Sequence, residues 1–162
     1  MKKTLCVISL VLSIIGCASV PLPQEGREIK FVEETSLKQK DAYNLALGYL
    51  AKNLGDSNFA IKVKDPDSGT IITEIAFDCP ELKGFMDLSR HAPVFNLEVG
   101  TKDKRVKFVF EALKDRLYNP MSGQFQLEEA FSSADKVELV KPCVQRVKAK
   151  ILKQMGRKDS NW

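Results

Sequence analysis

The sequence is poor in the side chains that carry most enzymatic chemistry. It has a single histidine, His91, in 162 residues, and none of its four cysteines forms a CxxC pair. The catalytic signatures GxSxG and HExxH do not occur. A catalytic triad or a Cys-His dyad would have to use His91, and the cysteine spacing gives little support to a zinc or redox centre. We therefore predict no catalytic residue, no metal and no cofactor.

A strong net charge is also lacking. The chain carries 25 Lys and Arg residues against 21 Asp and Glu residues, a net charge of +4. Proteins that bind nucleic acid usually concentrate a larger basic excess on one face, so we predict no nucleic-acid partner. The length of 162 residues and the hydrophobic fraction of 44% fit one globular domain and exclude a fibrous or wholly disordered chain.

The only long hydrophobic run lies at the N-terminus. Lys2 and Lys3 precede a largely apolar run of eleven residues, Leu5 to Ile15, interrupted only by Ser9 and Ser13. This run is too short to cross a bilayer core of about 30 Å as a helix, and it has the usual length for the apolar region of an export signal. It ends in Ile14-Ile15-Gly16-Cys17, which resembles the lipobox of bacterial lipoproteins.

The lipobox resemblance implies that residues 1–16 are a signal peptide and that the Cys17 thiol receives a lipid. The mature protein would then be held in the cell envelope by its lipid anchor. By the sorting rule of such lipoproteins, Ala18 after the lipidated cysteine favours the outer membrane, on its periplasmic face, if the cell is Gram-negative. The alternatives are an ordinary secretory signal cut after Ala18 and an uncleaved anchor.

The remaining chain divides into three parts. Residues 17–26 contain Pro21 and Pro23 and no periodic pattern, which predicts a flexible tether. Residues 27–156 form a single predicted domain, and residues 157–162 a short tail. Loss of residues 1–16 removes two lysines and no acid, so the mature chain is almost neutral.

Alternating and helical hydrophobic patterns predict seven elements in the domain. The alternating stretches are Glu28–Glu34, Phe59–Lys64, Ile71–Cys79, Phe95–Val99 and Val106–Glu111, and the helical stretches are Leu37–Leu54 and the region from Asp135 to Gly156. Ser36 is the expected N-cap of the first helix. Pro142 predicts a kink in the last helix or a start near Lys141. Residues 115–134 give no clear pattern, and we expect an irregular segment there.

The predicted order is β-α-β-β-β-β-α. We expect an α+β fold with a single antiparallel sheet of about five strands and both helices on one face. This order, the helix Asp41–Leu54 before a strand, and the hairpin Asp65–Gly69 followed by Thr70-Ile71-Ile72 resemble a family of bacterial domains of unknown function with a TATA-binding-protein-like (TBP-like) fold. Such domains are common on secreted proteins and lipoproteins. The resemblance implies a fold, without an established activity and without DNA binding.

Two cysteines remain in the domain. Cys79 lies on the inward face of its predicted strand, and Cys143 lies beside the apolar stripe of the last helix. An envelope compartment permits disulfides, so a Cys79–Cys143 bridge is one reading, and two separate buried thiols are the other. His91 is expected to be a loop histidine; the rival reading makes it the base that activates Cys79.

The functional prediction is a non-enzymatic, membrane-tethered binding or interaction module of the bacterial cell envelope. Its partner would be an envelope protein or a small ligand. The working surface would be the outward sheet face, with Lys62, Lys64, Glu74 and Asp78, or the loop Pro80–Pro93, since loops on a rigid scaffold often carry recognition. The alternatives are an envelope hydrolase whose site the sequence does not reveal and a structural spacer.

Overall fold

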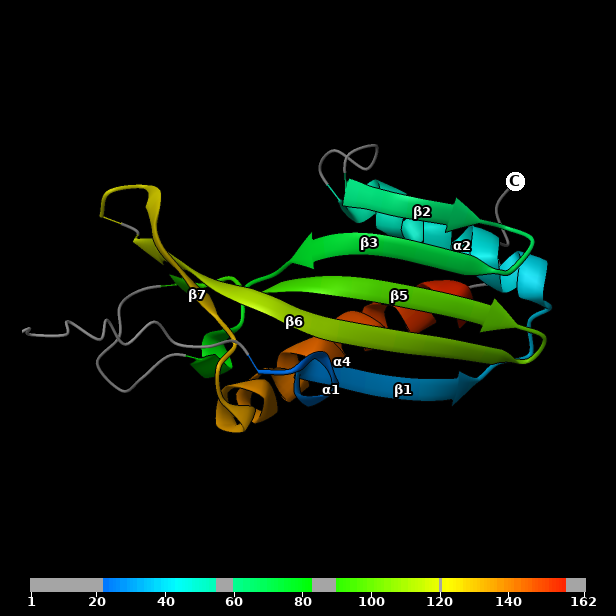
Figure 1. The fold of residues 1–162 in the computed structure, drawn as a ribbon. Helices are drawn as coiled ribbons and strands as arrows, with labels where there is room; N and C mark the ends of the chain where they lie inside the picture. Colours follow the sequence, from blue (N-terminus) through cyan, green and yellow to red (C-terminus); the bar gives the residue numbers. More distant parts are fainter. Residues whose placement is uncertain (1–21, 55–59, 83–89, 120, 157–162) are drawn as a thin grey trace, which may run out of the picture.

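The computed structural model describes residues 22–54, 60–82, 90–119 and 121–156 (Figure 1). The predicted signal peptide, the predicted lipidation site Cys17 and the tail 157–162 lie outside these residues. The elements, in chain order, are α1 (Gln24–Arg27), β1 (Glu28–Glu34), α2 (Gln39–Asn53), β2 (Ile61–Asp65), β3 (Thr70–Ala76), the 3-10 helix η1 (Pro80–Leu82), β4 (Arg90–His91), β5 (Val94–Lys102), β6 (Arg105–Asn119), β7 (Gln124–Ala130) and α4 (Ala134–Gly156).

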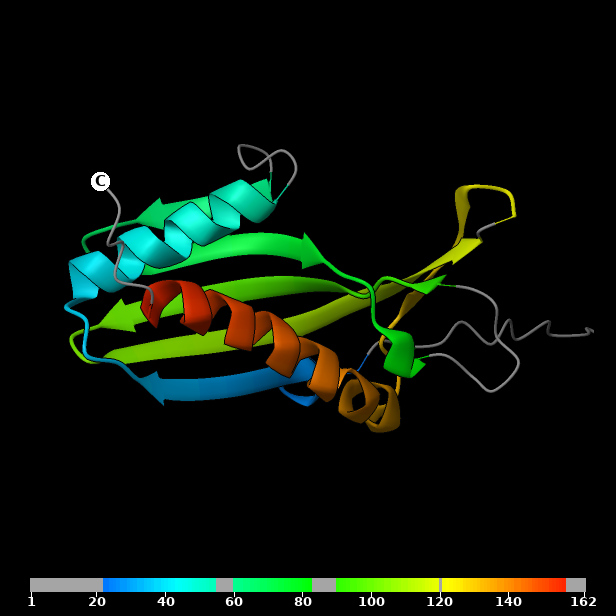
Figure 2. The same cartoon turned by 180° about the vertical axis from the view of Figure 1, so that it is seen from behind.

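The strands form one antiparallel sheet with the order β1-β6-β5-β3-β2. The two long helices, α2 and α4, lie side by side across the back of this sheet (Figure 2). Neither of them crosses the front, which we call the open face (Figure 1). The predicted α+β class, with one antiparallel sheet and both helices on one face, is confirmed.

The core lies between the helices and the sheet. Alternation along β5 and β6 directs Phe95, Phe108 and Phe110 to the helix side, where all three are completely buried. Burying one such side chain stabilises the fold by about 2–3 kcal/mol. Ala42 and Ala46 of α2 are also fully buried, and their small side chains let this helix approach the sheet closely.

A β-bulge in β2 reverses the alternation that the sequence predicts. Ile61 pairs with Thr73, but Val63 pairs with Ile72, so one extra residue lies between the two pairs. Val63 therefore shares the open face with Ile72 and is 39% exposed, although its spacing from Ile61 predicted the same inward face. Lys64, expected on the outward face, pairs instead with the inward-facing Ile71 at the edge of the sheet.

Residues 115–134 are not an irregular segment. β6 continues without a break to Asn119, and its far half pairs with both β4 and β7. This part of the ladder extends beyond the rest of the sheet (Figure 1). The sequence conceals it because polar residues stand where an apolar alternation is expected: Asp115 is almost fully buried, yet its partner is His91 rather than the hydrophobic core.

The helix ends differ from the prediction for reasons of tertiary structure. α2 begins after Lys38 without a side-chain cap from its own neighbourhood; the backbone N–H of Gln39 donates to Oδ1 of Asp103, 2.9 Å away in the β5–β6 turn. Ser36, the predicted N-cap, lies outside the helix. α4 begins at Ala134 with Pro142 inside it, so the alternative start near Lys141 is wrong. Its first turns point away from the axis of the rest (Figure 2), as expected for an internal proline.

Residues 22–26, which we expected to belong to the tether, pack on the domain. The backbone N–H of Leu22 donates to the carbonyl of Phe131 at 2.9 Å. Arg27, at the end of α1, donates to the carbonyls of Leu22 and Ala112 and forms a 3.0 Å ion pair with Glu111. Residues 22–26 therefore pack on the folded domain, although they belong to the predicted tether 17–26.

Candidate functional site

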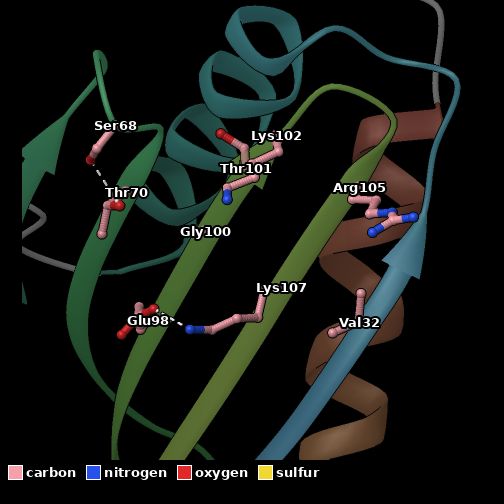
Figure 3. Close-up of a pocket in the computed structure, with 9 residues that line it drawn as sticks. All are labelled: Val32, Ser68, Thr70, Glu98, Gly100, Thr101, Lys102, Arg105 and Lys107. Atoms are coloured by element: carbon pink, nitrogen blue, oxygen red, sulfur yellow. Dashed lines mark hydrogen bonds and ion pairs between the residues drawn. The ribbon is translucent and has the colours of Figure 1, made fainter.

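The open face carries a hollow of about 330 Å³ near the β5–β6 turn (Figure 3). Side chains from β1, β5, β6 and the β2–β3 hairpin surround it. The lining residues are Val32, Ser68, Thr70, Glu98, Gly100, Thr101, Lys102, Arg105 and Lys107. We call this set the open-face hollow.

The hollow exists because one rung of the sheet has a glycine in its centre. Val32 of β1 pairs with Lys107 of β6, Lys107 pairs with Gly100 of β5, and Gly100 pairs with Thr70 of β3. Residues that pair directly across antiparallel strands point to the same face. Gly100 contributes no side chain there, so the floor between Lys107 and Thr70 stays open.

The next rung places two cations opposite each other. Lys102 and Arg105 form the last pair of the β5–β6 ladder, beside the turn. Like charges in directly opposed positions destabilise a sheet by a few tenths of a kcal/mol to about 1 kcal/mol. Across residues 22–54, 60–82, 90–119 and 121–156, neither side chain forms an ion pair with an acidic group. Local conflicts of this kind in an otherwise consistent fold are typical of functional positions.

The third cation of the hollow is neutralised. Lys107 Nζ lies 2.9 Å from Oε1 of Glu98, which comes from the neighbouring strand (Figure 3). Both side chains are partly exposed, so this pair contributes little to stability. The charged groups that line the hollow are Lys102, Arg105, Lys107 and Glu98, and Glu34, the direct partner of Arg105 in the β1–β6 ladder, lies on the same face beside them. Together these five groups leave an excess of one positive charge. The hollow is therefore suited to a negatively charged group.

The frame of the hollow is built by a tightly bonded turn. Oδ1 of Asp65 accepts from the backbone N–H groups of Asp67 and Ser68, each at 3.1 Å, and hydrogen bonds from Ser68 hold the pKa of the Asp65 carboxyl below its usual value. The carbonyl of Gly69 accepts from the backbone N–H of Thr101 at 2.8 Å and from its hydroxyl at 2.9 Å. These bonds connect the β2–β3 hairpin to β5.

At the opposite end of the sheet the structure joins the two domain cysteines. Cys79, just before η1, is disulfide-bonded to Cys143 of α4, with a Cα–Cα distance of 5.6 Å. The carboxylate of Glu81 accepts two hydrogen bonds from the guanidinium of Arg146, and this pairing lowers the pKa of Glu81. Donor atoms of Cys79, Glu81 and Cys143 lie within 4.8 Å of one another, but sulfurs that are bonded together are not thiolate ligands for a metal.

His91 lies in a buried pair rather than in an exposed loop. It belongs to β4, and its Nδ1 lies 2.6 Å from Oδ2 of Asp115 in β6. Only 8% of His91 and 3% of Asp115 are exposed. Burial raises the pKa of the Asp115 carboxyl, while its hydrogen bond to His91 acts in the opposite direction. Since the Cys79 sulfur is committed to Cys143, His91 has no thiol to activate there.

Comparisons with solved structures identify the class of fold. The chain is similar to a DUF4468 family protein from Bacteroides ovatus, with a TM-score of 0.57 and 13% identity over 90% of this chain and 95% of that one. It is also similar to a TBP-like protein from Parabacteroides distasonis, with a TM-score of 0.57 and 12% identity over 86% and 97%. No family model and no curated protein sequence matches the chain.

The chain therefore has the TBP-like fold of these domains of unknown function, as the sequence resemblance predicted. Because the identity is only 12–13%, this similarity shows the fold alone. In the part of the chain that the structure describes, no helix combines the length and apolar character needed to cross a membrane.

The sequence-predicted surfaces are only partly brought together. Lys62 and Glu74 form a 3.1 Å ion pair on the open face. Asp78 lies beyond the end of β3 and acts electrostatically on Arg146 of α4, so it does not belong to that face. Half of the loop Pro80–Pro93, residues 83–89, lies outside the described residues; the rest contains η1 and β4. The open-face hollow itself was missed, because only strand pairing shows that Gly100 lies between Lys107 and Thr70.

Proposed function

We propose that the protein is a lipid-anchored binding module of the bacterial cell envelope, which acts by binding an envelope component and not by catalysis. Cys17 would hold it in the membrane, on the periplasmic face of the outer membrane in a Gram-negative cell. The open face would be its working surface, and neither nucleic acid nor a cofactor would take part.

The observation that carries this proposal is a sheet face that both long helices leave uncovered and that contains the open-face hollow. Within the hollow, Val32 is 66% exposed, which is unusual for a branched apolar side chain in a strand. An exposed apolar side chain near cations that form no ion pair with any described residue is a surface suited to a ligand. This feature favours binding over the role of a passive spacer.

A second observation supports binding over hydrolysis. The Cys79 sulfur is bonded to Cys143, and a disulfide sulfur is not a nucleophilic thiolate. The only histidine is paired with Asp115 at a place where both side chains are almost completely buried. The one acid–base pair that includes His91 therefore has little contact with solvent, from which a polymer substrate would approach.

Site-specific photo-crosslinking in intact cells tests the working surface. A photoreactive amino acid replaces Val32 in the hollow or, as the control, Leu139, which is 49% exposed on α4. We expect light-dependent adducts with an envelope protein or glycan from position 32 and not from position 139. Equal adducts from both positions, or none from position 32, would contradict the proposal.

The anchor is tested separately. Replacing Cys17 with Ala removes the thiol that would carry the lipid, so the protein should leave the membrane fraction and become soluble. The control is Cys6→Ala, which lies in the predicted signal peptide and should leave the protein in the membrane fraction. Continued sedimentation of the Cys17→Ala protein with membranes would refute the lipid anchor.

A further inference from the structure

The charges of the open-face hollow restrict its ligand. Lys102 and Arg105 occupy directly opposed positions and form no ion pair with an acidic group among the residues that the structure describes. Arginine offers a planar set of five N–H donors that fits the oxygens of a carboxylate or a phosphate. The Arg105 side chain extends toward β1 and its strand-pairing partner Glu34 (Figure 3), so a negatively charged oxygen group would enter the hollow between the two cations and be attracted by both.

The volume of the hollow and its uncharged lining residues restrict the ligand further. A volume of about 330 Å³ is larger than a free inorganic anion needs. Beyond the cations the lining offers the hydroxyls of Ser68 and Thr70, which are hydrogen-bonded to each other at 2.9 Å, and the exposed aliphatic side chain of Val32. Hydroxyls and a small aliphatic surface match the hydroxyl groups and C–H faces of a sugar. The lining contains no aromatic ring on which a nucleobase would stack.

We propose that the open-face hollow binds an anionic saccharide, a sugar that carries a phosphate or carboxylate group. Lys102 and Arg105 attract the anionic group, and Ser68 and Thr70 hydrogen-bond the sugar hydroxyls above Gly100. Val32 lies on the same rung beyond Lys107 and borders the far side of the hollow. This assignment rests on the binding role proposed above and adds the chemical class of the ligand. Phosphate and carboxylate share the recognition chemistry, and the experiment separates them.

The hollow can be filled without disturbing the fold. A Cβ placed on Gly100 would meet only Cβ of Lys107, at 3.8 Å, an ordinary van der Waals distance. Gly100 also lies inside β5, where a β-branched residue is favoured over glycine. Gly100→Val should therefore occupy the floor of the hollow in a protein that is at least as stable as the parent. Arg105→Gln removes one of the two opposed cations.

A matched control removes a cation elsewhere on the same face. Lys30 of β1 is exposed and ion-paired with Glu28, and it does not line the hollow. Lys30→Gln changes the net charge by the same amount as Arg105→Gln. A difference between these two variants therefore reports on the hollow and not on the overall charge of the protein.

The experiment is isothermal titration of the full-length, lipidated protein in a non-ionic detergent. The probes are glucose 6-phosphate, glucuronate, glucose, inorganic phosphate and an acidic hexapeptide. We expect one of the two anionic sugars to bind at least tenfold more tightly than glucose, phosphate or the peptide, and the better of the two identifies the anionic group. Arg105→Gln should weaken this binding at least tenfold, Gly100→Val should abolish it with an unchanged or higher Tm, and Lys30→Gln should change it less than twofold.

Other outcomes overturn the proposal. If glucose binds as tightly as both charged sugars, the site does not require an anionic group. If inorganic phosphate or the acidic peptide binds as tightly as the charged sugars, the site does not select a saccharide. Binding that survives Arg105→Gln and folded Gly100→Val places the ligand elsewhere. If no sugar binds but position 32 still forms specific crosslinks in cells, this inference fails and the proposed binding function stands; if position 32 forms none, the function fails as well.

Discussion

His91 Nδ1 and Asp115 Oδ2 lie 2.6 Å apart in a buried pair that connects β4 to the far half of β6. The second carboxylate oxygen of Asp115 is also buried and accepts no hydrogen bond from any residue that the structure describes. Lys136 and Glu129 are the other charged groups that act on this carboxyl, with opposite effects. The pair holds together a part of the sheet that has few contacts with the helices.

Asp115→Asn tests whether the raised pKa of Asp115 makes the stability of the protein depend on pH. Burial raises the pKa of Asp115 in the folded protein, so protonation of this carboxyl stabilises the folded state. This contribution to the free energy of unfolding is complete at pH values below the ordinary pKa of 3.8. It is lost as the pH rises through the pKa of the folded state. The asparagine stays neutral and still accepts from His91. We expect its stability relative to the parent protein to increase from pH 4 to pH 7, on the order of 1 kcal/mol for each unit by which the pKa is raised.

Urea denaturation at several pH values measures this change. The exposed Asp67→Asn serves as the control for loss of a surface carboxylate. If the parent protein gains stability over the asparagine variant as the pH rises, the hydrogen bond from His91 outweighs burial, and the raised pKa is refuted.

The Cys79–Cys143 disulfide closes a loop with a sequence separation of 64 residues. By the chain-entropy model, removing a bridge over a loop of this length costs about 4 kcal/mol. We expect the Cys79→Ala/Cys143→Ala protein to unfold at a correspondingly lower urea concentration. Thiol titration of the denatured, unreduced Cys6→Ala/Cys17→Ala protein should find no free thiol. Two free thiols per chain would show that the cysteines are separate.

Gly69 is the residue in the β2–β3 turn that the fold needs most. Its φ is 72°, and a Cβ there would lie 2.4 Å from the carbonyl oxygen of Thr101. Gly69→Ala should therefore cost about 3 kcal/mol, from backbone strain and from the displaced β5 contact. Gly48→Ala is the matched control: a Cβ at this position in α2 meets nothing within 4 Å, and the change should stabilise the protein by about 0.5–1 kcal/mol. Thermal denaturation distinguishes them, and equal effects would contradict the turn geometry.

Lys104, in the β5–β6 turn, is the one described non-glycine residue with a positive φ, 62°. Lys104→Gly should relieve the strain of a non-glycine residue in the left-handed conformation. Glycine loses more backbone entropy on folding, which offsets part of this gain, so the net stabilisation should be about 0.5 kcal/mol. Its neighbour Asp103 provides the contrast, because Asp103→Ala removes the cap of α2 and should cost about 1 kcal/mol. Equal melting temperatures for both variants would refute this view of the turn.

Local patterns in the sequence predicted much of the scaffold. The first strand has the predicted bounds, Glu28–Glu34, because Ile29 and Phe31 alternate with polar residues on a strand that has one wet face. The apolar stripe of α4 is found on its buried side, from Val137 to Met155. Such patterns depend only on the period of a helix or a strand, so they can be read without knowledge of the partner elements.

The bulge in β2, the continuation of β6 past Asp115 and the capping of α2 by Asp103 could not be read in this way. Each depends on a partner that is distant in the sequence: Ile72 for the bulge, His91 for Asp115 and Gln39 for Asp103. The same holds for the candidate site. The predicted strand Val106–Glu111 contains Lys107, but only the register places Gly100 opposite Lys107 and Lys102 opposite Arg105.

The sequence by itself determined the scarcity of catalytic side chains, the balance of charge, the order of the main elements and the pattern that predicts an export signal, residues 1–16, directly before Cys17. The tertiary structure decided that the only histidine is paired with Asp115 and that Cys79 and Cys143 are joined. It also decided that Lys102 and Arg105, which form no ion pair with another described residue, border a hollow on the open face. The physical reason is that composition and periodicity are properties of neighbouring residues, whereas a site is formed by the register between strands and by contacts across many residues of chain.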